Sequence, residues 1–319
     1  MGILKAALRG SVIASAVAAA PLTAGAQEFI NVLTGGTSGV YYPMGVGLSD
    51  IYGTGIEGAR TQVQSTKASV ENLNLLQQGR GEIAFSLGDS VALAWEGDAD
   101  AGFPEKLDQL RGIAGIYSNY IQLVALEESG AATLSDLAGM GVSVGAPASG
   151  TELNARAILE AAGMSYDDLG KVEYLPFAES VELMKNRQLD ATLQSAGLGV
   201  ASIRDLSSSV PITVVEIPAD IAESLGAPYQ AATIPAGTYD GQEADVATVS
   251  IPNFLVTHAG VSDETAYQMT KLLFENLETL ASSHQAATQI SIDAALDGMP
   301  IPLDPGAERY YREQGLLQE

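Results

Sequence analysis

Three segments place glycines and hydroxyl-bearing residues where a strand ends and a helix is expected to begin: residues 35–43, 65–72 and 145–152. The first N–H groups of a helix have no partner within the helix, and they lie at the positive end of its dipole. Glycine lets the backbone approach a ligand closely, while Ser and Thr add hydroxyl donors. These turns therefore predict a site for a carboxylate that is held without Lys or Arg.

Helix capping is a purely structural explanation for the same residues, and it stays open for each turn taken alone. Ser149 and Glu152 have the spacing of a capping box. A Ser or Thr at a helix start needs no ligand to explain it. However, Tyr41 and Tyr42 follow the first turn directly, and a cap does not require two bulky amphipathic rings. This pair favours a binding site.

Two other patterns match catalytic or cofactor motifs in the wrong structural context. The Gly-x-Gly-x-x-Gly run at 53–58 is expected between a helix and the following strand, the reverse of a dinucleotide site. The Gly-x-Ser-x-Gly run at 141–145 centres on Ser143, but 142–144 is typical of a strand interior and not of a nucleophile elbow. A secreted serine hydrolase, with His258 or His284 as its base, is the alternative that these residues leave.

Neither metal binding nor catalysis has other support in the sequence. The chain has no Cys, and its two His are isolated from close carboxylate partners. We therefore expect a protein that is not an enzyme and carries no cofactor or metal. A bound carboxylate does not need a Lys or Arg partner at these helix starts. Any one of five arginines could still supply a cation to the site: Arg60, Arg80, Arg111, Arg156 and Arg204.

Charge and composition exclude further classes of partner. The 319 residues carry 15 Lys and Arg against 39 Asp and Glu, a net charge of −24. Such acidity argues against nucleic acid and anionic membrane surfaces as partners. Screening over about 8–10 Å means that this charge does not forbid a carboxylate bound locally. With 46% hydrophobic residues, the chain can bury a substantial core.

The N-terminus has the organisation of a secretory signal peptide. Lys5 and Arg9 precede an apolar run at 11–20, and Ala24 and Ala26 form a small-x-small cleavage site. The run is short for a transmembrane helix, and no later segment approaches the roughly 20 apolar residues of one. We expect residues 1–26 to be removed and the protein to be exported to the periplasm. The alternative is a buried N-terminal helix.

From Gln27 onward, strand-like and helix-like segments alternate, which predicts βαβ units and mostly parallel sheets. A similar pattern restarts after residues 111–117, so we expect two α/β lobes joined by crossings near 117–120 and 215–218. Signal peptide 1–26, lobe 1 (27–117 plus 218–319) and lobe 2 (118–217) are the predicted divisions. Three helices are expected near the C-terminus, at 263–282, 284–296 and 306–314.

Several motifs resemble those of one family, and they span nearly the whole chain after residue 26. The run Gly-Gly-Thr-Ser-Gly-Val-Tyr-Tyr-Pro-Met-Gly at 35–45 resembles the N-terminal signature of the TAXI family of TRAP transporter solute-binding proteins. Further family-like motifs follow in the expected order at 69–73, 88–89, 149–152, 234–239 and 302–315. The chain departs from the family pattern at Lys67-Ala68 (usually Gly-Gly), Gly88 (often Ser) and Asp304 (commonly His).

The resemblance implies a periplasmic-binding-protein type II-like fold, with two α/β lobes and a ligand cleft between them. It also implies a monomeric receptor that captures a small organic anion, such as glutamate or a related hydroxy or oxo acid, for a TRAP permease driven by an ion gradient. A binding module for a sensor is an alternative. The implied ligand contacts are Thr37, Tyr41, Tyr42, Ser69, Asn72, Asp89, Ser149, Gly150, Thr151, Gln194 and Ser195.

Overall fold

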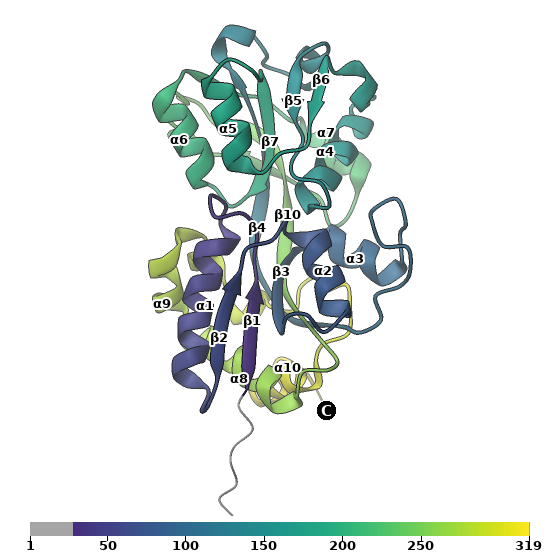
Figure 1. Ribbon diagram of the computed structural model, residues 1–319, viewed down its shortest axis with the longest axis vertical. Helices are drawn as coiled ribbons and strands as arrows, with labels where there is room; N and C mark the ends of the chain where they lie inside the picture. Colours follow the sequence, from purple (N-terminus) through teal and green to yellow (C-terminus); the bar gives the residue numbers. More distant parts are fainter. Residues whose placement is uncertain (1–27, 319) are drawn as a thin grey trace, which may run out of the picture.

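The computed structural model describes residues 28–318, so the predicted signal peptide lies outside the described residues. Helices cover both faces of a ten-stranded mixed sheet whose order is β2-β1-β3-β10-β4-β7-β5-β6, with β8 beside β4 and β9 beside β10 (Figure 1). No helix in this part of the chain has both the length and the apolar character needed to cross a membrane. The expected α/β class is confirmed.

The elements at the bottom of Figure 1 form what we call the lower half. Three parallel strands lie side by side there: β1 (Phe29–Leu33), β2 (Arg60–Gln64) and β3 (Ile83–Leu87). Each is followed by a helix, which gives the predicted βαβ alternation: α1 (Tyr41–Gly55), α2 (Ser69–Gln77) and α3 (Gly88–Glu96). The C-terminal helices return to this half: α8 (Asp263–Glu275), α9 (Leu277–Ser283) and α10 (Pro305–Glu313).

The upper half repeats the same design around a second set of parallel strands. These strands are β5 (Gly141–Ser143), β6 (Lys171–Glu173) and β7 (Ala191–Ala196). Their helices are α4 (Gly150–Ala161), α5 (Phe177–Lys185), α6 (Ala201–Ser209) and α7 (Ala219–Leu225). Two short strands complete the sheet: β8 (Ile212–Val214) and β9 (Gln230–Ile234).

Two long strands, β4 (Leu110–Leu126) and β10 (Val246–His258), run through both halves. They pair with each other antiparallel; β10 also pairs with β3, and β4 with β7. At about 3.4 Å per residue, strands of 17 and 13 residues are long enough to join the two parallel sets into one sheet. The predicted parallel strands are therefore parts of a single mixed sheet.

The predicted lobe boundaries stay a prediction, but packing favours a later second crossing than 217/218. Ile217, just before α7, and Ile221, within it, share a buried cluster with Ile158 of α4 and Leu193 of β7. This segment therefore packs with the upper half. The chain returns to the lower half within β10, beside the predicted first crossing in β4 at 117–120.

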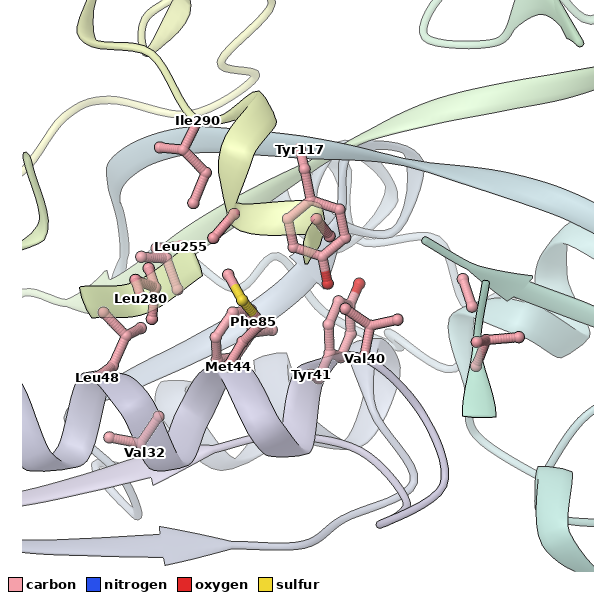
Figure 2. Close-up of a cluster of buried hydrophobic side chains, with 14 of the residues drawn as sticks. Val32, Val40, Tyr41, Met44, Leu48, Phe85, Tyr117, Leu255, Leu280 and Ile290 are labelled. Atoms are coloured by element: carbon pink, nitrogen blue, oxygen red, sulfur yellow. The ribbon is translucent and has the colours of Figure 1, made fainter. Parts of the chain in front are cut away.

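A buried cluster in the lower half holds α1 against the sheet (Figure 2). Met44 and Leu48 of α1 pack toward Leu255 of β10 and Leu280 of α9. The Tyr41 ring, at the first turn of α1, stacks on Phe85 with ring centroids 5.1 Å apart. The core thus fixes the start of α1.

The C-terminal segment differs from its prediction in two places. The helix expected at 284–296 is absent; two 3₁₀ turns, Gln285–Gln289 and Ile292–Ala294, stand there instead. The His284 ring caps the first of them by accepting a hydrogen bond from the Ala286 N–H. The helix expected at 263–282 is interrupted at Asn276, whose φ of −126° and ψ of 28° are not helical.

Candidate ligand-binding site

A cavity of about 330 Å³ lies where several helices of both halves begin. This volume is within the range of small-molecule sites, roughly 300–1,000 Å³. Its walls come from the turn after β1, the starts of α2, α4 and α5, and the middle of β4 and end of β7. The lining residues are Gly35–Tyr41, Ser65–Ser69, Leu87, Asn119, Ala146, Ser149–Thr151, Pro176–Glu179, Ser195 and Ala196.

Asn72 fixes the wall formed by the turn after β1. Its side-chain Nδ2 donates to the backbone oxygens of Thr34 (2.8 Å) and Phe85 (2.9 Å), so it ties the end of β1 to β3. The Thr66 hydroxyl lies 2.7 Å from the Asn72 Oδ1 and 2.7 Å from the Thr34 oxygen. Asn72 is fully buried and positions this wall without lining the cavity.

Two serines at helix starts present hydroxyl donors. The Ser69 Oγ, at the start of α2, accepts a hydrogen bond from the Leu87 N–H (3.1 Å). The Ser149 Oγ caps α4 by accepting one from the Glu152 N–H (3.2 Å). Both side chains are buried and line the cavity. Because each oxygen accepts from the backbone, its proton can donate, and for Ser69 the nearby Tyr41 hydroxyl oxygen is one possible acceptor.

The expected capping box at α4 is only half formed. Ser149 caps the helix as predicted, but the Glu152 carboxylate does not return to the Ser149 N–H. It pairs instead with the Arg156 guanidinium at 2.8 Å and accepts a hydrogen bond from the Tyr166 hydroxyl at 3.0 Å. The cap therefore leaves the α4 N-terminus open toward the cavity.

The starts of α2 and α4 touch across the two halves. A Cβ placed on Gly150 would lie 2.7 Å from the Ser69 Oγ and 2.6 Å from a Leu87 methyl carbon. The Glu71 N–H also donates to the Ala148 backbone oxygen at 3.3 Å. Only a glycine permits this approach without displacing its neighbours.

A chain of buried polar groups runs behind the cavity from α1 to β7. The Asn253 Nδ2 donates to the Tyr117 backbone oxygen (3.0 Å) and to the Asn119 Oδ1 (2.7 Å). Since a carbonyl only accepts, this fixes the Asn253 amide and turns its Oδ1 toward Tyr41, whose hydroxyl donates to it. The Asn119 Nδ2 in turn donates to the Ser195 backbone oxygen (2.9 Å).

Ser195 is the one lining residue whose buried hydroxyl has no partner within the described chain. Its side chain is only 6% exposed. An unpaired buried hydroxyl costs free energy, which a ligand atom in the cavity would recover. Ser195 is therefore a candidate contact for a polar ligand atom.

The cavity wall is mostly uncharged. Burial raises the pKa of Tyr41 far above its usual value, and the nearby Asp89 adds to the rise, so Tyr41 is a neutral phenol. Lys67 and Glu179 are the charged lining residues, and both are exposed. None of the five candidate arginines lines the cavity. Residues 28–318 contain no cluster of His, Asp and Glu suited to a metal ion.

Seven of the predicted contacts lie around this cavity: Thr37, Tyr41, Ser69, Ser149, Gly150, Thr151 and Ser195. Four do not line it. Tyr42 is half-buried on α1, and the Gln194 Oε1 accepts a hydrogen bond from Ser202. Asn72 holds the wall, as described above. Asp89 is buried and bonded to Asn154 and Tyr229 of the upper half.

Asn119 and Phe177 are among the lining residues that the sequence did not identify as contacts. Phe177 begins α5 just after β6, so the strand-turn-helix rule that identified α4 also applies to it. Asn119 interrupts an apolar stretch of β4, but only the pairing of β4 with β7 and β10 brings it to the site.

The hydrolase alternative is wrong. Ser143 is fully buried inside the upper half, and its hydroxyl bonds the Ser180 hydroxyl at 2.7 Å. The ring of His258 bonds the Gly260 N–H and that of His284 bonds the Ala286 N–H, so neither acts on Ser143. A buried serine without an adjacent base is not an activated nucleophile.

Two α/β halves on one sheet, with a donor-rich cavity at the helix starts of both, define the solute-binding class of periplasmic-binding-protein folds. The chain belongs to the NMT1-like family, whose model matches residues 32–315. This membership makes it a ligand-binding receptor for a solute and not an enzyme.

Solved structures share the fold at low sequence identity. Over 91% of this chain and 100% of the other, PhnD1 from Prochlorococcus marinus in complex with methylphosphonate is 8% identical, with a TM-score of 0.59. The periplasmic binding protein BugD is 12% identical over 91% of this chain and 94% of the other, with a TM-score of 0.57. A putative L-cystine ABC transporter protein from Listeria monocytogenes is 13% identical over 83% and 97%, with a TM-score of 0.51.

Proposed function

We propose that the chain is an extracytoplasmic receptor that captures a small organic anion in the periplasm and delivers it to a membrane transporter. The expected ligand is an acidic amino acid or a dicarboxylate, such as glutamate or a related hydroxy or oxo acid. The expected transporter is of the TRAP type, driven by an ion gradient, with the chain as its TAXI-family receptor.

The buried hydroxyls where α2 and α4 meet carry the ligand part of this proposal. Ser69 and Ser149 accept backbone N–H groups and are left to donate, and the unpartnered Ser195 adds a third hydroxyl. The first N–H groups of α4 and its dipole act at the same place. These donors suit a carboxylate better than a cation.

The remaining wall restricts the rest of the ligand. Val40, Leu87 and Phe177 are apolar, so they exclude water and strengthen the hydrogen bonds to a bound carboxylate. Lys67 and Glu179 carry opposite charges. A second carboxylate finds a counter-ion in Lys67, and an ammonium group finds one in Glu179. This supports acidic amino acids together with dicarboxylates.

A thermal-shift panel of amino acids, dicarboxylates, hydroxy acids and oxo acids tests the ligand class. A ligand present at 100 times its dissociation constant adds about 2.7 kcal/mol to the free energy of unfolding, which raises Tm measurably. If no small organic anion or amino acid raises Tm, the proposed ligand class is wrong.

Two buried serines give a matched pair for locating the site. Ser195→Ala removes a hydroxyl that lines the cavity, while Ser143→Ala removes one that bonds Ser180 elsewhere in the upper half. We expect Ser195→Ala to weaken binding of a ligand found in the panel by about 10- to 150-fold, as for the loss of one hydrogen bond to a charged group. Ser143→Ala should leave the dissociation constant unchanged.

Uptake into proteoliposomes that contain a TRAP permease tests the transporter. We expect uptake to require this receptor and an ion gradient across the membrane, and to continue without ATP. Loss of uptake on removal of ATP, with the gradient intact, would contradict the TRAP assignment.

A further inference from the structure

Asp89 lies at the start of α3 in the lower half, and two side chains of the upper half surround its carboxylate. The Asp89 Oδ2 accepts hydrogen bonds from the Asn154 Nδ2 (2.6 Å) and the Tyr229 hydroxyl (2.7 Å). The Asp89 Oδ1 accepts the Ser90 N–H at 2.6 Å. Asp89 is 4% exposed, and its carboxylate has no Lys or Arg partner among residues 28–318.

Both upper-half partners belong to segments far from Asp89 in sequence. Asn154 lies 65 residues away on α4, and Tyr229 lies 140 residues away, directly before β9. Figure 1 shows α3 in the lower half and α4 above it. These hydrogen bonds therefore depend on how the two halves are placed.

Other residues of α4 dock on the lower half beside this carboxylate. Leu153 packs in a lower-half cluster with Val70 and Leu73 of α2. The Arg156 guanidinium donates to the Asp100 backbone oxygen at 3.1 Å. The same helix begins at the cavity with Ser149, Gly150 and Thr151. A contact that holds α4 against the lower half therefore also positions the α4 N-terminus at the cavity.

We infer that Asp89, Asn154 and Tyr229 form an interlobe latch. By this we mean a buried carboxylate of the lower half whose hydrogen bonds to two upper-half side chains hold the two halves in the arrangement with α4 over the cavity. The latch does not touch the ligand, so its residues are positioning residues. This inference rests on the proposed receptor function, in which the halves close around a solute. If these donors are lost, the buried Asp89 Oδ2 has no partner from the upper half, and only Ser90 still bonds the carboxylate, at Oδ1. The closed arrangement is therefore sensitive to each of the two donors.

The chain offers a matched control for the latch. Tyr229→Phe removes a phenol that bonds a carboxylate across the halves. Tyr166→Phe removes a phenol that bonds the Glu152 carboxylate within the upper half, at 3.0 Å. Both variants lose one hydroxyl and keep the aromatic ring. Only the first is expected to alter the placement of the halves.

Distances between two spin labels measure that placement without any ligand. The chain has no Cys, so Asp50→Cys on α1 and Glu160→Cys on α4 introduce unique labelling sites at exposed positions. In the otherwise unchanged chain, we expect a major population at the distance given by this structure. Tyr229→Phe and Asp89→Asn should each move most of it to longer distances, and Tyr166→Phe should not.

The double variant separates a latch from two independent contacts. Tyr229→Phe added to Asp89→Asn should lengthen the distance little further, because the carboxylate that the phenol binds is already gone. Three results would each overturn the inference: an unchanged distribution in Tyr229→Phe, an equal shift in Tyr166→Phe, or only long distances in the labelled parent. The distances are measured without ligand, so a failed ligand panel and a failed latch are distinguishable.

Discussion

At the scale of single residues, the chemistry of the site depends on the acceptor to which each hydroxyl donates its hydrogen bond. Ser69 and Ser149 accept backbone N–H groups, whereas Tyr41 donates to Asn253. The serine hydroxyls can thus donate to a ligand, whereas the Tyr41 hydroxyl already donates to a buried side chain of the protein. Residue type alone does not reveal this difference, because the partners come from distant parts of the chain.

Gly150 is the residue whose replacement should most directly disturb the cavity. In Gly150→Ala, the new Cβ would lie under 3 Å from Ser69 and Leu87 side-chain atoms, so either these side chains or the starts of α2 and α4 must move. We expect a loss of about 1–3 kcal/mol in the free energy of unfolding, as for other overpacked sites. Denaturant unfolding followed by the fluorescence of Trp95, the single tryptophan, measures it.

Gly36→Ala is the control for this prediction. Gly36 also lines the cavity, but a Cβ there meets nothing within 4 Å. Its stability should stay within about 0.5 kcal/mol of the parent. Equal losses in the two variants would show that the close contact at Gly150 does not limit the approach of the helices.

His258 should make stability depend on pH. Burial lowers the pKa of its imidazole, and its Nδ1 accepts the Gly260 N–H at 3.1 Å, which requires the neutral ring. The unfolded state therefore binds a proton first, near its ordinary pKa of about 6.5. The contribution of neutral His258 is fully present above that pH and is lost as the pH falls toward the lower folded pKa.

The His258→Gln variant isolates this contribution. The difference in unfolding free energy between the parent and the variant should shrink as the pH falls from 7.5 to 5, in denaturant titrations at each pH. A difference that is constant across this range would contradict the assignment.

At the scale of elements, two of the helix starts at the cavity follow an alanine with strained backbone. Ala68, before α2, has φ 70° and ψ −150°, and Ala148, two residues before α4, has φ 58°. Positive φ is rare for residues with a Cβ, and the region of Ala68 is populated almost only by glycine. The turns thus hold their shape against a local cost, which core packing and Asn72 offset.

Ala68→Gly should stabilise the protein. Relief of backbone strain is worth about 1–3 kcal/mol, and the extra freedom of glycine in the unfolded chain costs about 0.5–1 kcal/mol. We expect a net gain of about 1 kcal/mol in unfolding free energy, measured by denaturant titration. Ala92→Gly, within α3, relieves no strain and should lose about 1 kcal/mol. A loss in both variants would contradict the strain at Ala68.

Elements whose identity depends on local pattern were predictable from the sequence. The amphipathic pattern and the following Gly79 predicted α2, and the strand-turn-helix order predicted the starts of α1, α2 and α4. Asn119 and the role of Asp89 were not predictable, because they depend on pairings 76 and 140 residues apart. The prediction of a helix at 284–296 was wrong. The side chains of His284 and Ser291 accept backbone N–H groups two residues later and so start two separate 3₁₀ turns.

At the scale of the whole molecule, the two halves are coupled through β4 and β10. The register of this strand pair shifts between Pro252 and Phe254, and again between Leu255 and Val256. Such irregularities bend and twist a strand pair. Pro252 is tolerated within β10 because it stands at such a site. The change of register lies next to Asn253, so the polar chain behind the cavity crosses the sheet at its most irregular point.

Asn253→Leu should therefore weaken the molecule as a whole and not one element alone. The variant leaves the Tyr41 hydroxyl and the Asn119 Oδ1 buried without the partner that joins α1, β4 and β10. Each unpaired group costs about 1–3 kcal/mol, so for the two groups we expect a loss of about 2–6 kcal/mol in unfolding free energy. Calorimetry should show a lower Tm for a single cooperative transition.

Tyr41→Phe in the same background tests whether these groups act as one unit. Alone, Tyr41→Phe should cost about 1 kcal/mol, because it removes the donor to Asn253. Combined with Asn253→Leu it should cost much less, or even restore some stability, because the hydroxyl it removes is then already unpaired. Strictly additive losses would mean that the two side chains contribute independently, and that the hydrogen bond between them does not join α1 to β10.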